Sequence, residues 1–455
     1  MLPSRLLPRN LSRTFFDERP GGAGGMSGRG TPGPEAAVRA AKAPAPVAPA
    51  APAPTGGSRT RTAWLTVAGI LLIALNLRLA ISSTAALLDQ VRGQLGFGPA
   101  VASLVPALPV ILFAFAGASS TLLARRLGTE RALLAALGAL AAGIAVRGIP
   151  GTGALLAGIV LGSAGLAVCN VLLPVVVRTH FPKKIALLTS LYTMAMSLGS
   201  AAAAAVAVPI ANASGSASLG LAAWAIPAVI ACVVWGMRSD SWRSAAAESA
   251  HGSVLVARPD TKVSALRVGR TRFGLLVTAL FALQAMNSYA IIGWLPGILT
   301  DSGMSSSAAG STLGVVLIVG VPATFLLMPL AATTRGLRVA FVTVAGALLA
   351  GYVGLLAAPS AAPLLWALLL GAGMSTFPLI LAVIGRSGGS PQEAAALSTF
   401  AQSTGYLVAA VGPFMVGMVH SATGSWTLPL VLLIGATVLQ LAVALALTAR
   451  KSGRR

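Results

Sequence analysis

The stretch "WLTVAGILLIALNLRLAISSTAALL", residues 64–88, decides the fold class of this chain. Its side chains are mostly apolar or small, and Arg78 is the one charged residue within it. At about 1.5 Å per residue, a helix of this length crosses a hydrocarbon core of roughly 30 Å. The stretch therefore predicts a transmembrane helix that carries an arginine near its middle.

Apolar runs of similar length recur throughout the 455 residues. The chain is 56% hydrophobic and only 9% charged, with a mean hydropathy of +0.85. A soluble domain carries about 25% charged residues, so this composition cannot cover a water-facing surface. We predict an all-α membrane protein of twelve transmembrane helices in two six-helix bundles. The predicted spans are residues 64–88, 100–122, 131–148, 151–177, 185–210, 217–237, 273–299, 307–331, 337–358, 361–384, 392–419 and 426–448.

The longest polar stretch between spans, residues 238–272, divides the chain into two halves. Shifting the sequence by 211 residues lays Asn76 on Asn287, as expected of a parallel internal repeat. We therefore predict one bundle over residues 64–237, a cytoplasmic loop over 238–272, and a second bundle over 273–448.

The ends of the chain differ in composition from the spans. Residues 1–63 are rich in Pro, Ala and Gly with scattered Arg, and such a segment cannot bury enough apolar surface to offset the entropy of ordering. We predict a disordered tail there, and a short basic tail over residues 449–455.

The chain has 32 Lys and Arg against 10 Asp and Glu, which gives a net charge of +22. Nearly all of the basic residues fall in the tails and in loops on one side of the predicted spans. This asymmetry is the positive-inside pattern, and it predicts an inner-membrane protein with both termini in the cytoplasm. The basic balance thus indicates topology and attraction to the lipid bilayer, and we predict no nucleic-acid partner.

Cys169 and Cys232 are the two cysteines, and both lie inside apolar spans. Thiols in this setting, without a metal-ligand pattern, are typical of small buried side chains, so we expect neither a disulfide nor a metal. The sequence also has no H-E-x-x-H motif and no Walker loop. We predict a protein that is not an enzyme, needs no cofactor and does not use ATP directly.

Arg78 is the strongest functional candidate. A charged side chain at mid-membrane depth costs about 2.5–3.5 kcal/mol or more, so it must face protein or water. The sequence offers it no carboxylate at the same depth, because Asp89 lies about 16 Å further along the helix. A planar guanidinium left open in this way can hold a carboxylate or a similar anion with two hydrogen bonds. The alternative is a structural arginine held by backbone carbonyls or water.

Polar side chains on several spans are candidates for the same site. Gln284, Asn287 and Ser288 share one face of the seventh span, and a polar stripe of this kind suits one wall of a small-solute site. The alternative for each is an interhelical hydrogen bond that stabilises the bundle. The predicted substrate-binding residues are Arg78, Ser82, Asn170, Tyr192, Gln284, Asn287, Tyr289, Trp294, Gln402 and Tyr406.

The sequence does not indicate a coupling ion. Proton-coupled carriers commonly use an Asp, Glu or His within the membrane. Here His180 and His420 lie at span ends, and Glu393 begins the eleventh span. Uniport, anion exchange and co-transport with a protonated substrate all stay open.

Several longer motifs point to one family. They are "ALNLRLAISS" at 74–83, "CNVLLPVVVRTHFPKKIALLTSLYTMAMSLG" at 169–199, "YAIIGWLPGIL" at 289–299, "EAAALSTFAQSTGYLVAAVGPFMVG" at 393–417 and "SATGSWTLPL" at 421–430. With these motifs, residues 64–448 resemble the major facilitator superfamily, and within it the branch of cyanate permeases and 2-nitroimidazole transporters. The resemblance implies two helical bundles that rock around a central site, with Arg78 facing substrate.

The turn "LLARRLGTERA", residues 122–132, is similar to the family's loop between the second and third spans. We assign Arg126, Gly128, Glu130 and Arg131 to this predicted gating loop. Arg125 stands where the family has an Asp, so the usual ion pair is in doubt, although Glu130 is close by. The Gly-Pro motif of drug:proton antiporters is also missing from the fifth span, which argues against multidrug efflux.

These observations together predict a monomeric permease of the plasma membrane for a small-molecule substrate. The leading hypothesis is a small anion, cyanate-like or organic, carried by alternating access. The alternative is efflux of small drugs or nitroimidazole-type solutes by the same fold.

Overall fold

The computed structural model describes residues 56–238, 264–386 and 390–449, and their regular secondary structure is helical throughout. Eleven of the described helical stretches are long and apolar enough to cross a membrane, and one pair bent by 58° supplies a twelfth if it is counted as a single span. The predicted all-α membrane class is therefore confirmed.

The first half of the chain begins with α2, which starts at Gly56, so residues 56–63 of the predicted tail are helical. The bend in the second span lies between α3 and α4, after Pro106 and Pro109, as expected where proline removes backbone hydrogen bonds. The helices of this half are α2 (Gly56–Leu95), α3 (Pro99–Ala114), α4 (Ala116–Leu127), α5 (Thr129–Val146), α6 (Thr152–His180), α7 (Ile185–Ser214), α8 (Ala217–Ala222) and α9 (Ala225–Gly236).

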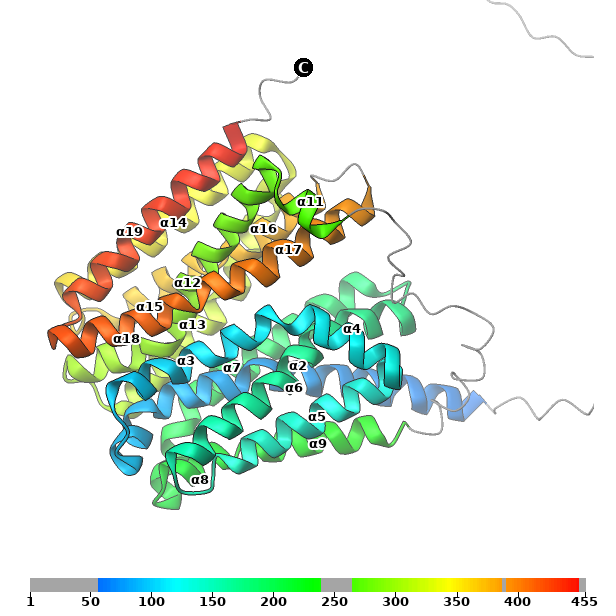
Figure 1. Cartoon of the computed structure of the whole chain (residues 1–455), viewed down its shortest axis with the longest axis horizontal. Coiled ribbons are helices and arrows are strands. Elements are labelled where there is room, and N and C mark those ends of the chain that lie inside the picture. The colour runs from blue at the N-terminus through cyan, green and yellow to red at the C-terminus, as the bar shows by residue number, and fades with distance from the viewer. Residues whose placement is uncertain (1–55, 239–263, 387–389, 450–455) are drawn as a thin grey trace, which may run out of the picture. The chain divides into compact units, whose positions relative to one another are not determined.

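The second half repeats this pattern of long helices and broken spans (Figure 1). Its elements are α11 (Ala265–Gly269), α12 (Arg272–Asp301), α13 (Ser306–Leu327), the 3-10 helix η1 (Met328–Ala332), α14 (Thr334–Ala357), α15 (Pro363–Gly373), α16 (Thr376–Gly385), α17 (Pro391–Ala409), α18 (Val411–Thr423) and α19 (Thr427–Ala449). Most boundaries fall within a few residues of the predicted spans. The predicted tails at 1–55 and 450–455 and most of the predicted loop lie outside the described residues.

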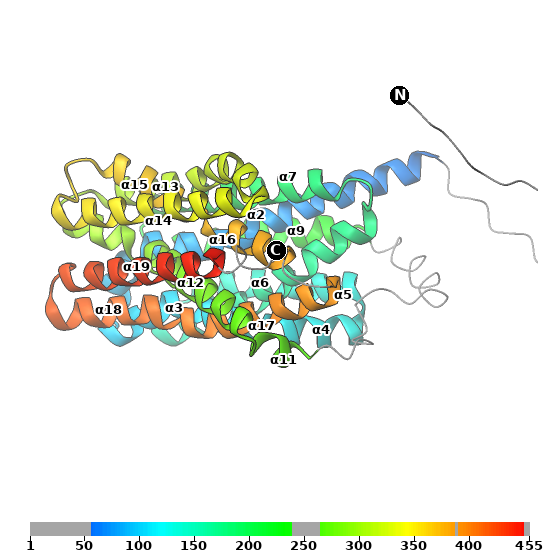
Figure 2. The ribbon, with the colours of Figure 1, turned by 90° about the horizontal axis from the view of Figure 1, so that it is seen from above.

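Helices pack mainly within each half. In the first half α2 packs on α7 and α9, and α5 packs on α6; in the second, α12 packs on α17 and α19, and α14 packs on α15. The halves meet where α13 contacts α7 and where α17 and α18 run beside α3 (Figure 2).

The two asparagines that the sequence shift pairs have matching environments. The Asn76 amide nitrogen donates to Leu72 O at 2.8 Å and to Pro227 O of α9 at 3.1 Å. The Asn287 amide nitrogen donates to Leu283 O at 3.1 Å and to Gln440 Oε1 of α19 at 3.0 Å. Each asparagine thus joins the first long helix of its half to the last, as an internal repeat requires. The exact domain boundaries stay a prediction.

Among the described residues, the closest backbone approaches between the halves lie at one end. We call the end where α2 begins and α19 ends the terminal side, and the other end the opposite side. On the opposite side, a Cβ added at Gly293 would lie 2.7 Å from Pro106 Cβ, and one at Gly310 would lie 2.4 Å from Ala204 O. Thr300 Oγ1 also donates to Asp89 Oδ2 across the halves at 3.3 Å. Glycines therefore let the two backbones close on this side.

Backbone contact between α5 and α6 gives a stability test. A Cβ added at Gly143 would lie 2.2 Å from Gly162 N, whereas one at Gly138 of the same helix would meet nothing within 4 Å. We expect Gly143→Ala to destabilise the protein by about 1–3 kcal/mol through overpacking. Gly138→Ala should be neutral or stabilising, by up to about 1 kcal/mol, because alanine favours helix.

The measurement is the melting temperature of each purified variant in detergent. Gly143→Ala should melt several degrees below the natural protein, and Gly138→Ala at or above it. Equal melting temperatures for the two variants would contradict the close α5–α6 packing.

Candidate substrate cavity

A cavity of about 910 Å³ lies between the two halves. Its lining comes from α2, α3, α4, α6 and α7 of the first half and from α12, α13, η1, α16 and α17 of the second. It runs from Arg78 near the middle of α2 to Arg178 and Met328, which lie at the terminal-side ends of their helices. A second cavity of about 810 Å³ shares Arg178 and Pro174 with it and widens the mouth. The cavity is thus open toward the terminal side, while the opposite side is closed by packing.

Arg78 lies at the deep end of this cavity and is half-buried. No hydrogen bond or ion pair joins its guanidinium to any residue that the structure describes, although it acts electrostatically on Tyr289 and Tyr406. Arg78 and Arg178 are the charged side chains of the described lining, which includes no acidic residue. The cavity is therefore positively charged, and its low-dielectric walls concentrate that field.

Aromatic rings close the deep end of the cavity. The ring of Phe113 from α3 lies 6.2 Å from that of Tyr289 on α12 and 5.5 Å from that of Tyr406 on α17. Tyr406 also packs edge-on against Phe281 at 4.9 Å, and the two tyrosine rings are 6.2 Å apart. Such tilted and edge-on contacts are the favourable geometries for aromatic pairs. The cluster joins both halves at the point where the cavity ends.

The structure brings seven of the predicted binding residues to the cavity wall. Gln284 and Gln402 face it from the second half, and each donates within its own helix, to Ser288 Oγ and Ser398 Oγ respectively, both at 2.8 Å. Their amide oxygens accept no hydrogen bond from the residues that the structure describes. The seven residues are Arg78, Asn170, Tyr192, Gln284, Tyr289, Gln402 and Tyr406.

Three predicted binding residues lie outside the cavity. Ser82 is one turn from Arg78, but it is buried and its hydroxyl hydrogen-bonds Ser200 of α7. Trp294 lies beyond the cavity toward the opposite side, where its Nε1 donates to Pro413 O at 2.7 Å. Helix packing thus takes up both side chains.

Asn287 is the third, and a buried polar network accounts for it. Its amide oxygen accepts from Tyr352 Oη at 3.0 Å and from Thr437 Oγ1 at 3.4 Å, while its nitrogen binds Gln440 as described above. Gln440 Nε2 in turn lies 3.3 Å from Thr376 Oγ1. Asn287 therefore forms interhelical hydrogen bonds, the alternative to a place in the substrate site, because its amide nitrogen and oxygen both have partners inside the second half.

Glu130 is the residue of the predicted gating loop that has charged partners. Its carboxylate lies 3.1 Å from Arg238 Nη1 and 3.2 Å from His180 Nε2, and the Arg238 guanidinium stacks on Trp235 at 4.1 Å. Burial lowers the pKa of Arg238, and the Glu130 carboxylate opposes that shift. All of these partners belong to the first half, so the network ties α5, α6 and the end of α9 together.

The other gating-loop residues are at the surface. Arg126 and Arg131 are exposed, and Gly128 adopts φ +80° at the turn between α4 and α5. The positive φ explains the glycine at that position, because it is strained for other residues.

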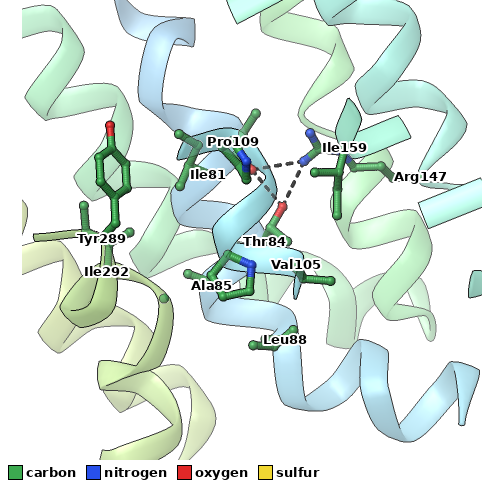
Figure 3. A pocket seen from close by; sticks show the side chains of 13 residues that line it. Ile81, Thr84, Ala85, Leu88, Val105, Pro109, Arg147, Ile159, Tyr289 and Ile292 are labelled. Carbon is green, nitrogen blue, oxygen red and sulfur yellow. Dashed lines mark hydrogen bonds between the residues drawn. The ribbon is translucent and has the colours of Figure 1, made fainter. Parts of the chain in front are cut away.

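Sequence reasoning missed Arg147. It follows α5 at the opposite side, only 3% exposed, and Nη1 donates to Ala80 O at 3.0 Å and to Thr84 Oγ1 at 2.9 Å (Figure 3). An arginine at the end of a span ordinarily extends to the interface, so its position alone gave no signal. A cue was available in Gly158 and Gly162, because their missing side chains leave room for the Arg147 chain against α6.

Residues 66–413 match the family described as Major Facilitator Superfamily. The 2-nitroimidazole transporter of Escherichia coli (strain K12) is 36% identical over 83% of this chain and 93% of the relative. The cyanate transport protein CynX of the same organism is 28% identical over 78% of this chain and 90% of its own length. A solved bacterial homologue of the human lysosomal transporter Spinster, inward-facing and occupied, is similar in fold, with a TM-score of 0.67 and 16% identity over 86% of this chain and 96% of that one.

The open, positive cavity can be tested with charged thiol reagents. In a chain with Cys169→Ala and Cys232→Ala, Ser403→Cys lies on the cavity wall, whereas Ser82→Cys is buried between α2 and α7. We expect the thiol of Ser403→Cys to react with these reagents and the thiol of Ser82→Cys to stay unmodified. The anionic reagent sulfonatoethyl methanethiosulfonate should react about tenfold faster than its trimethylammonium analogue, after each rate is divided by that for a free thiol, because the local potential attracts anions.

The matched control adds Arg78→Gln to the Ser403→Cys chain, which should remove most of that preference. Rates are read from the loss of fluorescent maleimide labelling. A preference for the cationic reagent would contradict the charge assigned to this cavity.

Proposed function

The chain belongs to the Major Facilitator Superfamily of membrane transporters, and from this premise we propose that it carries a small anion by alternating access around Arg78. Family membership confirms the resemblance seen in the sequence motifs. It fixes the class of activity, transport of a small solute across the membrane. The identity of that solute is our proposal, and it depends on the chemistry of the cavity.

One observation carries the proposal. The Arg78 guanidinium faces a water-accessible cavity whose described lining offers it no carboxylate. An uncompensated charge at this depth is costly, and a substrate anion would lower that cost when it binds. A carrier for cations would be expected to have the opposite charge in this position. The charge of the cavity therefore favours an anionic substrate.

Neighbouring groups can complete the recognition of an anion. The phenols of Tyr289 and Tyr406 belong to the aromatic cluster at the deep end of the cavity. Both phenols interact electrostatically with Arg78. A phenol donates a hydrogen bond to an anion while its ring excludes water. Gln284 and Gln402 add amide groups from the second half. A compact anion could thus contact Arg78 from one half and neutral donors from the other.

The packing of the halves supports an alternating mechanism. Transport requires that the opposite side open while the terminal side closes. The close approach of Gly293 to Pro106 and the ring contacts of Phe113 with Tyr289 and Tyr406 would then separate. We place the terminal side in the cytoplasm because basic residues are concentrated there. In that orientation the described state is open to the cell interior.

The second candidate is a neutral nitroimidazole-like solute, and two observations favour it. A relative that is 36% identical is named a 2-nitroimidazole transporter, and the aromatic cluster offers faces on which a planar ring could stack. In that case Arg78 would bind the nitro group, which carries partial rather than full charge. Such a carrier should tolerate loss of the arginine charge better than an anion carrier.

Flux through the purified full-length protein in proteoliposomes distinguishes the two. We expect uptake of [14C]cyanate, with competition by formate and nitrite. Arg78→Ala should reduce this flux at least about tenfold, because a charge-assisted hydrogen bond contributes about 1.5–3 kcal/mol. Arg78→Lys should restore only part of it, because lysine lacks the planar two-donor geometry.

Arg335→Ala is the matched control, since Arg335 is an exposed arginine of α14 outside the cavity lining. It should leave cyanate flux within about twofold. Transport of 2-nitroimidazole alone, with no anion flux in the natural protein, would replace the leading proposal by the second. Full anion flux in folded Arg78→Ala would remove Arg78 from the site.

A further inference from the structure

A third, small cavity lies directly behind the aromatic end of the 910 Å³ cavity. It holds about 20 Å³, which is room for one water molecule. Tyr289 and Ile292 of α12 line both cavities, so the same helix face separates them. Figure 3 shows these two residues on one side of the small cavity and Arg147 on the other, with Thr84 of α2 near the arginine.

Arg147 is the one charged residue of the described lining of this small cavity. Arg147 is 3% exposed, and its Nε has no hydrogen-bond partner among the described residues. Nη1 is held by a carbonyl and a hydroxyl, both neutral acceptors. No ion pair within the described chain compensates the charge. A buried guanidinium in this state retains unused donors.

The two cavities follow one another along α2, while Arg147 contacts this helix through Ala80 and Thr84, about 120–160° around its axis from Arg78. Arg78, Ile81 and Ala85 stand at i, i+3 and i+7 of α2, so they follow one another along a single face. Arg78 lines the large cavity, and Ile81 and Ala85 line the small one. Because Arg147 binds α2 at Ala80 and Thr84, its guanidinium lies roughly 3–9 Å further along the helix axis than Arg78.

The small cavity also borders the contact that must open during transport. Pro106 of α3 and Gly293 of α12 both line it, and these are the residues whose close approach joins the halves on the opposite side. Separation of α3 from α12 would enlarge the space beside Arg147 and connect it to the opposite side. The same separation would give the unused donors of Arg147 access to solute.

We propose that Arg147 forms a second anion-binding subsite, which receives a small monovalent anion on the opposite side of the aromatic cluster. This inference rests on the proposed anion transport. An anion would bind Nε and a terminal nitrogen of Arg147 when the opposite side is open, and would pass between Arg147 and Arg78 as the halves rock. In the described state the space admits only water, so the subsite is closed.

A purely structural role is the competing explanation. An arginine that only ties α5 to α2 would lose its two hydrogen bonds to α2 in Arg147→Gln. That loss should lower the melting temperature and leave the KM values measured from the two sides of the membrane unaltered. The difference between the KM values measured from the two sides of the membrane, here called the sidedness of transport, separates the two explanations.

The experiment measures [14C]cyanate flux into right-side-out and inverted membrane vesicles, with the voltage held at zero by potassium and valinomycin. For Arg147→Gln we expect the KM from the opposite side to rise about tenfold. The KM from the terminal side should stay within about twofold while the maximal rate falls by the same tenfold factor. For a passive carrier the ratio of maximal rate to KM must be equal in the two directions. Weaker anion binding at Arg147 should therefore raise the KM measured from the opposite side and lower the maximal rate measured from the terminal side.

Arg92→Gln is the matched control, because Arg92 is an arginine at the opposite-side end of α2 that lines neither cavity. It should change both KM values by less than about twofold. If Arg147→Gln fails to insert, Ala85→Val fills the small cavity while keeping the charge. It should give the same one-sided rise in KM.

The outcomes separate the subsite from the function on which it rests. Absence of anion flux in the natural protein would overturn both. Anion flux that is lost in Arg78→Ala, but unaltered in sidedness by Arg147→Gln and by Ala85→Val, would overturn the subsite alone. A lower melting temperature for Arg147→Gln with unaltered KM values would assign the arginine a structural role.

Discussion

A guanidinium inside the membrane needs hydrogen-bond acceptors from the protein or from water, and this constraint organises the first half of the molecule. Arg78 has no described protein partner, so the face of α2 on which it lies must border a cavity. In the described state the halves are therefore separated at that depth toward the terminal side. Arg147 meets the same constraint differently, because two neutral acceptors on α2 hold it inside the bundle. Both charges thus involve α2, because Arg78 lies on this helix and Arg147 donates hydrogen bonds to it.

Small residues make this arrangement possible. In lipid there is no hydrophobic force to drive helices together, so close backbone contact has to supply the packing energy. Gly143, Gly158 and Gly162 bring α5 and α6 so near that the Arg147 side chain fits between them and α2. Gly293 and Gly310 do the same between the halves on the opposite side. The cavity stays open where bulky rings and long polar side chains replace such glycines.

Hydropathy and spacing were sufficient to predict the spans, because the bilayer fixes both the length and the composition of a transmembrane helix. The sequence also predicted that Arg78 has no acidic residue at its depth, and the described cavity lining around it contains none. The roles of Ser82 and Asn287 did not follow from the sequence. A polar residue on a helix face can line a cavity or bond a neighbouring helix, and only the packing of α7 and α19 against that face decides between them.

Arg147 was beyond sequence reasoning for a related reason. The end of an apolar run does not tell whether the residue there extends to water or turns back into the bundle. That choice depends on the acceptors at Ala80 and Thr84, which belong to a helix far away in the chain. The glycines of α6 permit the inward turn, but they would equally permit close packing alone.

Positions related by the 211-residue shift carry different chemical groups in the two halves. Residues separated by 211 positions meet at the interface on the opposite side, where Thr300 donates to Asp89. The same shift lays Arg78 on Tyr289, and both line the cavity. Equivalent positions thus carry a cation in the first half and a phenol in the second. The described charged groups of the cavity come from the first half, and the second half contributes only neutral groups. Under the proposed mechanism, rocking of the halves would move a charged wall against an uncharged one. A bound anion would then follow the arginines of the first half, and the second half would decide on which side it is released.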